Sequence, residues 1–214
     1  MTDLVLDGHG FTITQTCVAG VMEAAGTGAL TLRDVTITGG QSSSANGGGG
    51  VSAEGELTVE RSTIIGNSAE NGGGGISGDL MTITDSTISG NQGGDSGGGG
   101  VSARLVSITG STISGNEAQA GGGVAAGGIQ LVNTTVTGNT ATELGGGLFV
   151  GEGEIVLVYG TIVGNTGATG ANVNMFSGAG SVRSFGTVIA RPNGSVNCVV
   201  SNVTSHYSFS DDTS

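Results

Sequence analysis

Three charged residues, Asp34, Arg61 and Asp85, hold the same position in successive segments of this sequence, each three residues before an aliphatic residue. If the segments stack as neighbouring strands, the three side chains form a row with about 5 Å between members. Such a row gathers two carboxylates and a guanidinium on one face, so it is a candidate for catalysis. Opposite charges on neighbouring strands are also ordinary stabilising pairs. We therefore predict a structural row of salt bridges and retain these residues as the candidates for catalysis.

The remaining ionisable residues do not converge on a reaction. Several carboxylates recur near one turn of the repeat, where such groups are usually solvated: Glu54, Glu56, Asp79, Glu152 and Glu154. Glycosidases need two carboxyls held about 5–10 Å apart in a cleft. His9 and His206 lie in opposite terminal regions, so they define no Ser-His-Asp triad. We expect neither a metal site nor a cofactor, and we favour a protein that is not an enzyme.

The two cysteines, Cys17 and Cys198, lie near opposite ends of the chain. In a stack of eight coils these ends are on the order of 30 Å apart, whereas a disulfide needs Cα atoms within about 7 Å. We predict that the two cysteines do not pair with each other.

The candidate residues are embedded in an internal repeat. An aliphatic residue preceded by Thr recurs at positions 13, 37, 64, 88, 113, 136, 162 and 188, so successive centres are 24, 27, 24, 25, 23, 26 and 26 residues apart. An asparagine preceded by glycine follows three residues later in five segments: Asn67, Asn91, Asn116, Asn139 and Asn165. A glycine run then ends directly before another aliphatic residue, as at Gly75 and Ile76.

This pattern predicts an all-β fold, a right-handed parallel β-helix of about eight coils of 23–27 residues. Alternation of apolar and polar residues indicates short strands with one buried face, three to a coil, and stacking of the coils creates a continuous core. Runs of Gly and Thr-Ile-Ser are poor helix formers, which excludes a helical solenoid. Within a single domain, 1–214, we expect residues 1–27 to form the first coil, 28–189 the regular body and 190–214 a C-terminal cap.

Two of the repeated columns are best interpreted as structural. Stacked asparagines can hydrogen-bond to one another along the axis, and the preceding glycine permits a positive φ at the corner. The glycine runs lack the lysine and the following helix of a phosphate-binding loop, so they predict tight corners or a flat wall without side chains. The loops before these runs lie at the surface, where ligands can bind.

A column of threonines is the sharpest indication of a surface function. Eight threonines precede the aliphatic centres and should point outward: Thr12, Thr36, Thr63, Thr87, Thr112, Thr135, Thr161 and Thr187. This grid resembles the ice-binding face of β-solenoid antifreeze proteins, although Ile65, Val163 and Ile189 interrupt the second column. The alternative is that Thr simply suits strands.

The charge of the chain excludes several partners. The formal net charge is −12, and the five cationic residues are all arginines. Such a chain repels nucleic acid phosphates and anionic membrane surfaces. No stretch approaches the roughly 20 apolar residues of a membrane helix, so we expect no membrane insertion. The N-terminal residues do not resemble a signal peptide, and we interpret any export signal as absent from this chain.

The repeat resembles that of bacterial right-handed β-helix exoproteins, including the choice-of-anchor Q and polymorphic outer membrane protein-like groups. The resemblance rests on the units 57–76 and 129–142, on the first coil Leu6–Ile13 and on the tail 197–212. It implies a secreted or cell-surface location and a fragment of a longer exported protein. Members usually carry a second cysteine after the one matched by Cys198, so the resemblance implies a partner for Cys198 outside this chain.

Three functional classes follow from these observations. We favour a non-catalytic scaffold or adhesion module with an unidentified extracellular partner, for which a glycan is the candidate. A second class is a carbohydrate-active enzyme or glycan-binding module, because Asp34, Arg61 and Asp85 resemble the acidic calcium ligands and basic residue of parallel β-helix polysaccharide lyases. The third class is ice binding through the threonine column.

Overall fold

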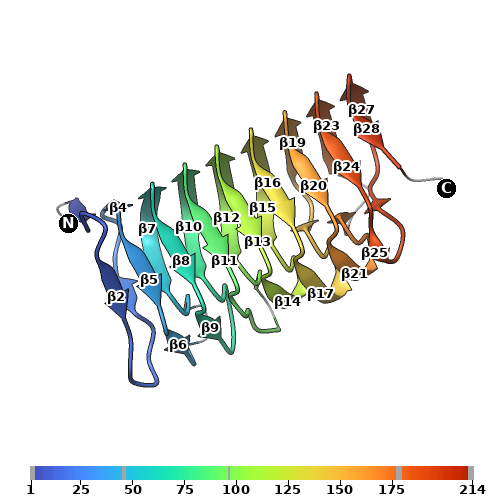
Figure 1. Cartoon of the computed structure of the whole chain (residues 1–214). Coiled ribbons are helices and arrows are strands. Elements are labelled where there is room, and N and C mark those ends of the chain that lie inside the picture. The colour runs from blue at the N-terminus through green and yellow to red at the C-terminus, as the bar shows by residue number, and fades with distance from the viewer. Residues whose placement is uncertain (1–2, 45–46, 96, 177–179, 212–214) are drawn as a thin grey trace.

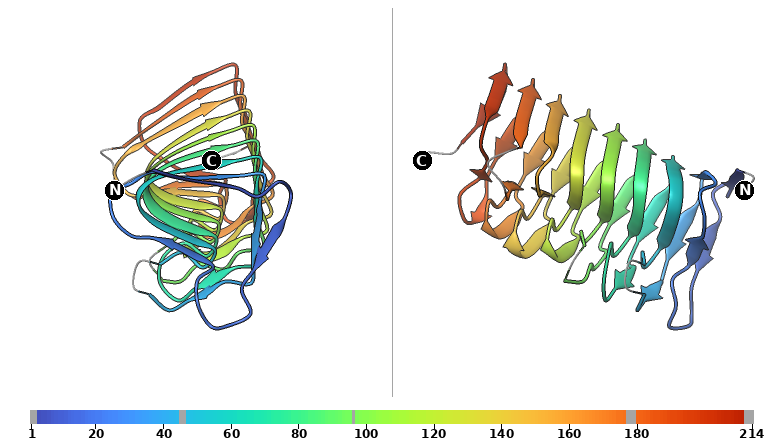
Figure 2. Two further views of the ribbon diagram at one scale, coloured as in Figure 1. Left: turned by 90° about the vertical axis from the view of Figure 1, so that its left-hand side faces the viewer. Right: turned by 180° about the vertical axis from the view of Figure 1, so that it is seen from behind.

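The chain folds as a parallel β-solenoid in which each coil stacks on the previous one. The computed structural model describes residues 3–44, 47–95, 97–176 and 180–211, and these contain strands but no helix. Every described strand pair is parallel and joins residues about one coil apart. The coils follow one axis, with the two termini at opposite ends (Figures 1 and 2). The parallel β-helix predicted from the repeat is therefore confirmed.

The first sheet forms the longest wall of the solenoid. Within the described residues it contains thirteen strands, which are β1 (Leu4–Asp7), β3 (Met22–Ala24), β4 (Leu30–Arg33), β7 (Val51–Glu60), β10 (Ile76–Thr84), β12 (Val101–Thr109), β15 (Val124–Val132), β18 (Leu148–Val150), β19 (Glu154–Val158), β22 (Val173–Met175), β23 (Ser181–Phe185), β26 (Cys198–Val199) and β27 (Val203–His206).

The second sheet carries the repeated Thr-aliphatic motif. Its strands, again among the described residues, are β2 (Thr12–Thr14), β5 (Thr36–Thr38), β8 (Thr63–Ile65), β11 (Thr87–Ser89), β13 (Thr112–Ser114), β16 (Thr135–Thr137), β20 (Thr161–Val163), β24 (Val188–Ala190) and β28 (Phe209–Ser210). Short strands in two smaller sheets form the third wall: β6 (Gln41–Ser42) with β9 (Ser68–Ala69), and β14 (Glu117–Ala120) with β17 (Thr140–Leu144), β21 (Thr166–Thr169) and β25 (Asn193–Gly194).

The strand that follows each glycine run is longer than the repeat suggested. The repeat predicts three short strands to a coil, but β7, β10, β12 and β15 each run without interruption from the glycine run into the first strand of the next coil. The backbone remains extended at this junction, and one extra residue of β7 is absorbed as a register shift opposite Gly78 and Leu80. The sharp corners are elsewhere, at the glycine runs and at residues with positive φ.

The core is a set of aliphatic columns that run along the axis. Ile37, Ile64, Ile88 and Ile113 occupy one column, and each is completely buried. Full burial of such a side chain stabilises the fold by about 1.5–3 kcal/mol. Because each coil contributes only a few of these side chains, the coils are stable as a stack rather than singly.

The eighth coil corrects one assignment from the sequence. The strand pairing places Ile189, not Val188, beside Ile162, and it places Val188 beside Thr161. Thr187 is therefore not part of the outward threonine column; it lies at the preceding corner and is fully buried. In the second column Ala190, rather than Ile189, is the partner of Val163.

The C-terminal segment follows the path of the coils. Its strands β25, β26, β27 and β28 pair in parallel with β21, β22, β23 and β24. The tail thus departs from the repeat in sequence while it continues the solenoid as a further coil.

Candidate functional site

The charged candidates lie at a corner where the backbone adopts positive φ. The φ values of Asp34, Arg61 and Asp85 are 50°, 44° and 49°. The same corner is occupied in later coils by Gly110, Asn133, Tyr159 and Gly186, all with positive φ. Gly, Asn and Asp tolerate this conformation best. The backbone therefore accounts for the two aspartates independently of any chemistry.

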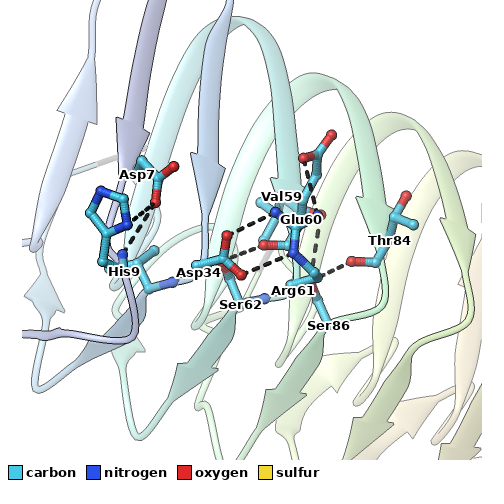
Figure 3. A network of polar contacts seen from close by, with 10 residues as sticks. Asp7, His9, Asp34, Val59, Glu60, Arg61, Ser62, Thr84 and Ser86 are labelled. Atoms are coloured by element: carbon cyan, nitrogen blue, oxygen red, sulfur yellow. Dashed lines mark hydrogen bonds and ion pairs between the residues drawn. The ribbon is translucent and has the colours of Figure 1, made fainter.

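The first two members of the row form a closed ion pair (Figure 3). Arg61 donates from Nε to Oδ1 of Asp34 at 2.9 Å and from Nη2 to Oδ2 at 2.8 Å. Its Nη1 also lies 3.7 Å from the Glu60 carboxylate. Within the described chain, Asp85 makes no ion pair with Arg61; its carboxylate lies against Gly110 of the next coil. The predicted three-member row is therefore a pair plus a separate aspartate.

The electrostatics of this pair oppose acid–base catalysis. The hydrogen bond from Arg61 holds the pKa of the Asp34 carboxyl below its usual value of 3.8. The same bond raises the pKa of Arg61 above its ordinary range. A general acid needs a raised carboxyl pKa and a basic arginine needs a lowered one. Both groups are thus held in the ionised state that suits a salt bridge.

Replacing Arg61 with glutamine should move the Asp34 pKa upward and leave stability at neutral pH almost unchanged. The folded-state pKa of Asp34 is depressed, so the pair stabilises the fold above pH 3.8 and loses this contribution as the pH falls through the folded pKa. The pair is exposed and screened by solvent. Carbon-detected NMR titration of the Asp34 carboxyl would measure the shift; an unchanged Asp34 pKa would contradict the assigned pairing.

The asparagine column forms a continuous buried ladder, as predicted. In the middle of the ladder, at Asn91, Asn116, Asn139 and Asn165, the side-chain oxygen accepts from both the backbone N–H and the amide of the preceding Asn, as Asn116 does from Asn91 at 3.0 Å each. Each amide also donates to a backbone carbonyl, such as Asn116 to Ile88. Beyond Asn165 the ladder continues to Asn172 and Asn197, which the repeat had not indicated. Gly66, Gly90 and the equivalent glycines precede the ladder with positive φ.

The structure contains a second ladder that was not predicted from the sequence. Buried hydroxyls beside the charged corner accept the backbone N–H of the preceding coil: Ser62 from Val35, Ser86 from Ser62, Ser111 from Ser86, and Thr187 from Gly160. The same hydroxyls donate to a carbonyl two residues earlier, for example Ser62 to Glu60 at 2.7 Å. The available signal was a Ser or Thr directly before the Thr-aliphatic pair in four coils, at Ser62, Ser86, Ser111 and Thr134. The polar groups of both ladders therefore form hydrogen bonds between neighbouring coils.

The threonine column exists in seven coils. Thr12, Thr36, Thr63, Thr87, Thr112, Thr135 and Thr161 are in register on the second sheet. Thr12 is exposed and the other six are half-buried by their neighbours. The second column reads Thr14, Thr38, Ile65, Ser89, Ser114, Thr137 and Val163 along the same sheet. The hydroxyl grid is therefore regular in one column and broken in the other.

Comparison with known proteins does not assign this arrangement to a family. No protein-family model, curated protein or solved structure matches the chain. Among the described residues, no group of three or more His, Cys, Asp and Glu side chains is placed to hold a metal ion. The same residues contain no helix that is long and apolar enough to cross a membrane.

The cysteines lie far apart in the stack. Cys17 is an exposed free thiol in the first coil, and Cys198 lies on β26 in the last coil. The prediction that they do not pair with each other is confirmed.

Proposed function

We propose that this chain is a non-catalytic scaffold or adhesion module that acts outside the cell, secreted or at the cell surface. The observation that carries the proposal concerns the asparagine and serine ladders. Their polar side chains are hydrogen-bonded to neighbouring coils and are therefore not available for catalysis. The closed Arg61–Asp34 pair supports it, because both groups are held in the state that suits a salt bridge. Binding of a partner would then take place on the outward faces of the sheets and on the surface loops.

The extracellular location is supported by the repeat and by the charge. The repeat resembles that of bacterial β-helix exoproteins, and a net charge of −12 favours solubility and disfavours nucleic acid. Partners recognised through hydrogen bonding, such as glycans, suit this surface better than polyanions do.

A combined retention and turnover assay tests the proposal. The protein is run through gels containing xylan, cellulose derivatives, pectate or alginate, and the same mixtures are assayed for new reducing ends and unsaturated uronides. We expect retention by at least one polysaccharide and no product. Product formation that disappears in Arg61→Gln would overturn the proposal and establish the lyase alternative; retention by none of the polymers would also count against an adhesion role towards glycans.

The threonine column supports a second candidate, ice binding. Seven in-register hydroxyls at a spacing of about 4.8 Å form the kind of regular flat array that an ordered water layer could match. Ice crystals grown with the protein would be shaped if this candidate is correct, and Thr87→Lys should abolish the shaping. Unshaped crystals would remove the candidate.

A further inference from the structure

A polar groove of about 790 Å³ lies on the outer face of the first sheet, in the N-terminal half of the solenoid. Its floor contains one outward serine from each of three successive coils: Ser52 on β7, Ser77 on β10 and Ser102 on β12. Its side wall is made by the segments 18–20, 41–44 and 47–48, in which Ser43 and Ser44 are exposed and Ser42 is buried. Ser77 is only 9% exposed, so the accessible hydroxyls are those of Ser52 and Ser102 on the floor and of Ser43 and Ser44 on the wall.

The floor is rigid and its hydroxyls are evenly spaced. The serines alternate with inward residues of the core, such as Val51 and Ala53, which are buried. Each floor strand is paired on both sides, β7 with β3 and β10, and β12 with β10 and β15. Successive serines are therefore about 4.8 Å apart along the axis. Because the floor has no open strand edge, the groove cannot bind a peptide by adding a strand.

The charges around the groove disfavour an anionic ligand. Three carboxylates, Glu23, Glu54 and Asp79, line it with a single guanidinium, Arg104. Arg104 is paired with Asp79 through Nε and Oδ1 at 2.6 Å, and Glu54 accepts the backbone N–H of Gly26 at 2.6 Å. The groove therefore presents acceptors and hydroxyls with a net negative charge, which repels phosphates and uronates.

We propose that this groove binds a neutral oligosaccharide lying along the solenoid axis across three coils. Sugar hydroxyls both donate and accept, which matches a surface of serine hydroxyls and carboxylate acceptors. The floor strands β7, β10 and β12 stack along the solenoid axis, which gives a linear chain a direction to follow. This inference rests on the proposed function, since it supplies the partner class of a non-catalytic module.

Isothermal titration calorimetry of the whole chain with defined hexasaccharides tests the inference. The probes are cellohexaose, xylohexaose, mannohexaose and maltohexaose, with hexagalacturonate as the anionic comparison. The test variant is Ser52→Gln/Ser102→Gln, which fills the floor with longer polar side chains. The matched control is Ser89→Gln/Ser114→Gln, the same change at outward serines on the second sheet. Circular dichroism establishes that both variants are folded.

We expect a neutral hexasaccharide to bind wild type and control within about twofold of each other, and the groove variant to bind at least about tenfold more weakly. Equal affinity of groove variant and wild type, tighter binding of hexagalacturonate, or no binding of any neutral probe would overturn the inference. Mass spectrometry of the same samples separates the two proposals. Cleaved saccharide would overturn the non-catalytic function, whereas intact saccharide bound outside the groove would overturn only the groove.

Discussion

Replacing Asn116 with alanine is expected to destabilise the protein by about 3–5 kcal/mol. The Asn116 side chain is 1% exposed and lies in the middle of the ladder. Its oxygen accepts from the backbone and the amide of Asn91, and its own amide donates to Ile88 and Asn139. Alanine would leave several of these buried groups without a partner, at a cost of about 1–3 kcal/mol each.

Urea unfolding followed by circular dichroism measures this loss, and Gln92→Ala is the control. Gln92 also carries an amide, but it is exposed and stands directly after ladder residue Asn91. We expect Gln92→Ala to change the free energy of unfolding by less than about 0.5 kcal/mol. Similar values for the two variants would show that the ladder does not hold the coils together.

Replacing Gly99 with alanine is expected to cost about 3 kcal/mol or more, or to prevent folding. A Cβ at Gly99 would meet the backbone oxygen of Gly122 and the backbone N and O of Glu117 in the next coil. These atoms belong to paired strands and corners, so they cannot move aside as a flexible side chain would. The glycine run is thus predicted to be a contact surface between coils.

Alanine substitutions at two other glycines serve as controls for the loss of stability expected from Gly99→Ala. At Gly90 a Cβ meets nothing within 4 Å but φ is +60°, so alanine should cost about 1 kcal/mol through backbone strain alone. At Gly151 a Cβ also meets nothing within 4 Å and φ is not positive, so alanine should be neutral or slightly stabilising. Thermal unfolding of the three variants should follow this order. A Gly99→Ala protein as stable as Gly151→Ala would contradict the contact assigned to the glycine run.

The fold was predictable because its strongest signals repeat at the coil period. Ile64, Ile88 and Ile113 mark one buried column, and Asn91 and Asn116 mark another, so both columns follow from spacing alone. The eighth coil misled the sequence reasoning because Val188 and Ile189 are both aliphatic and Thr187 imitates the outward threonine. The corner glycine, Gly186, was the correct marker, since it occupies the place of Asp34 and Arg61 in earlier coils.

The surface was less predictable, for physical reasons. Ser62 and Ser86 are polar residues of a type that is usually exposed, and they are buried only because the neighbouring coil packs against them. Asp85 was expected to extend the charged row, but its carboxylate lies against Gly110 of the next coil. The absence of a side chain at Gly110 leaves the space that this carboxylate occupies. The groove depends on the segments 18–20 and 41–44, which lie outside the repeat pattern and so carry no periodic signal.

The most direct test of the account is NMR mapping of backbone amides during titration with the neutral hexasaccharides. One spectrum distinguishes the outer groove from the charged corner and the threonine face. We predict that the perturbed amides cluster around Glu23, Ser52, Ser77 and Ser102, while those of Asp34, Arg61 and Asp85 do not shift. Perturbations centred on that corner, or on the threonines of the second sheet, would contradict the account.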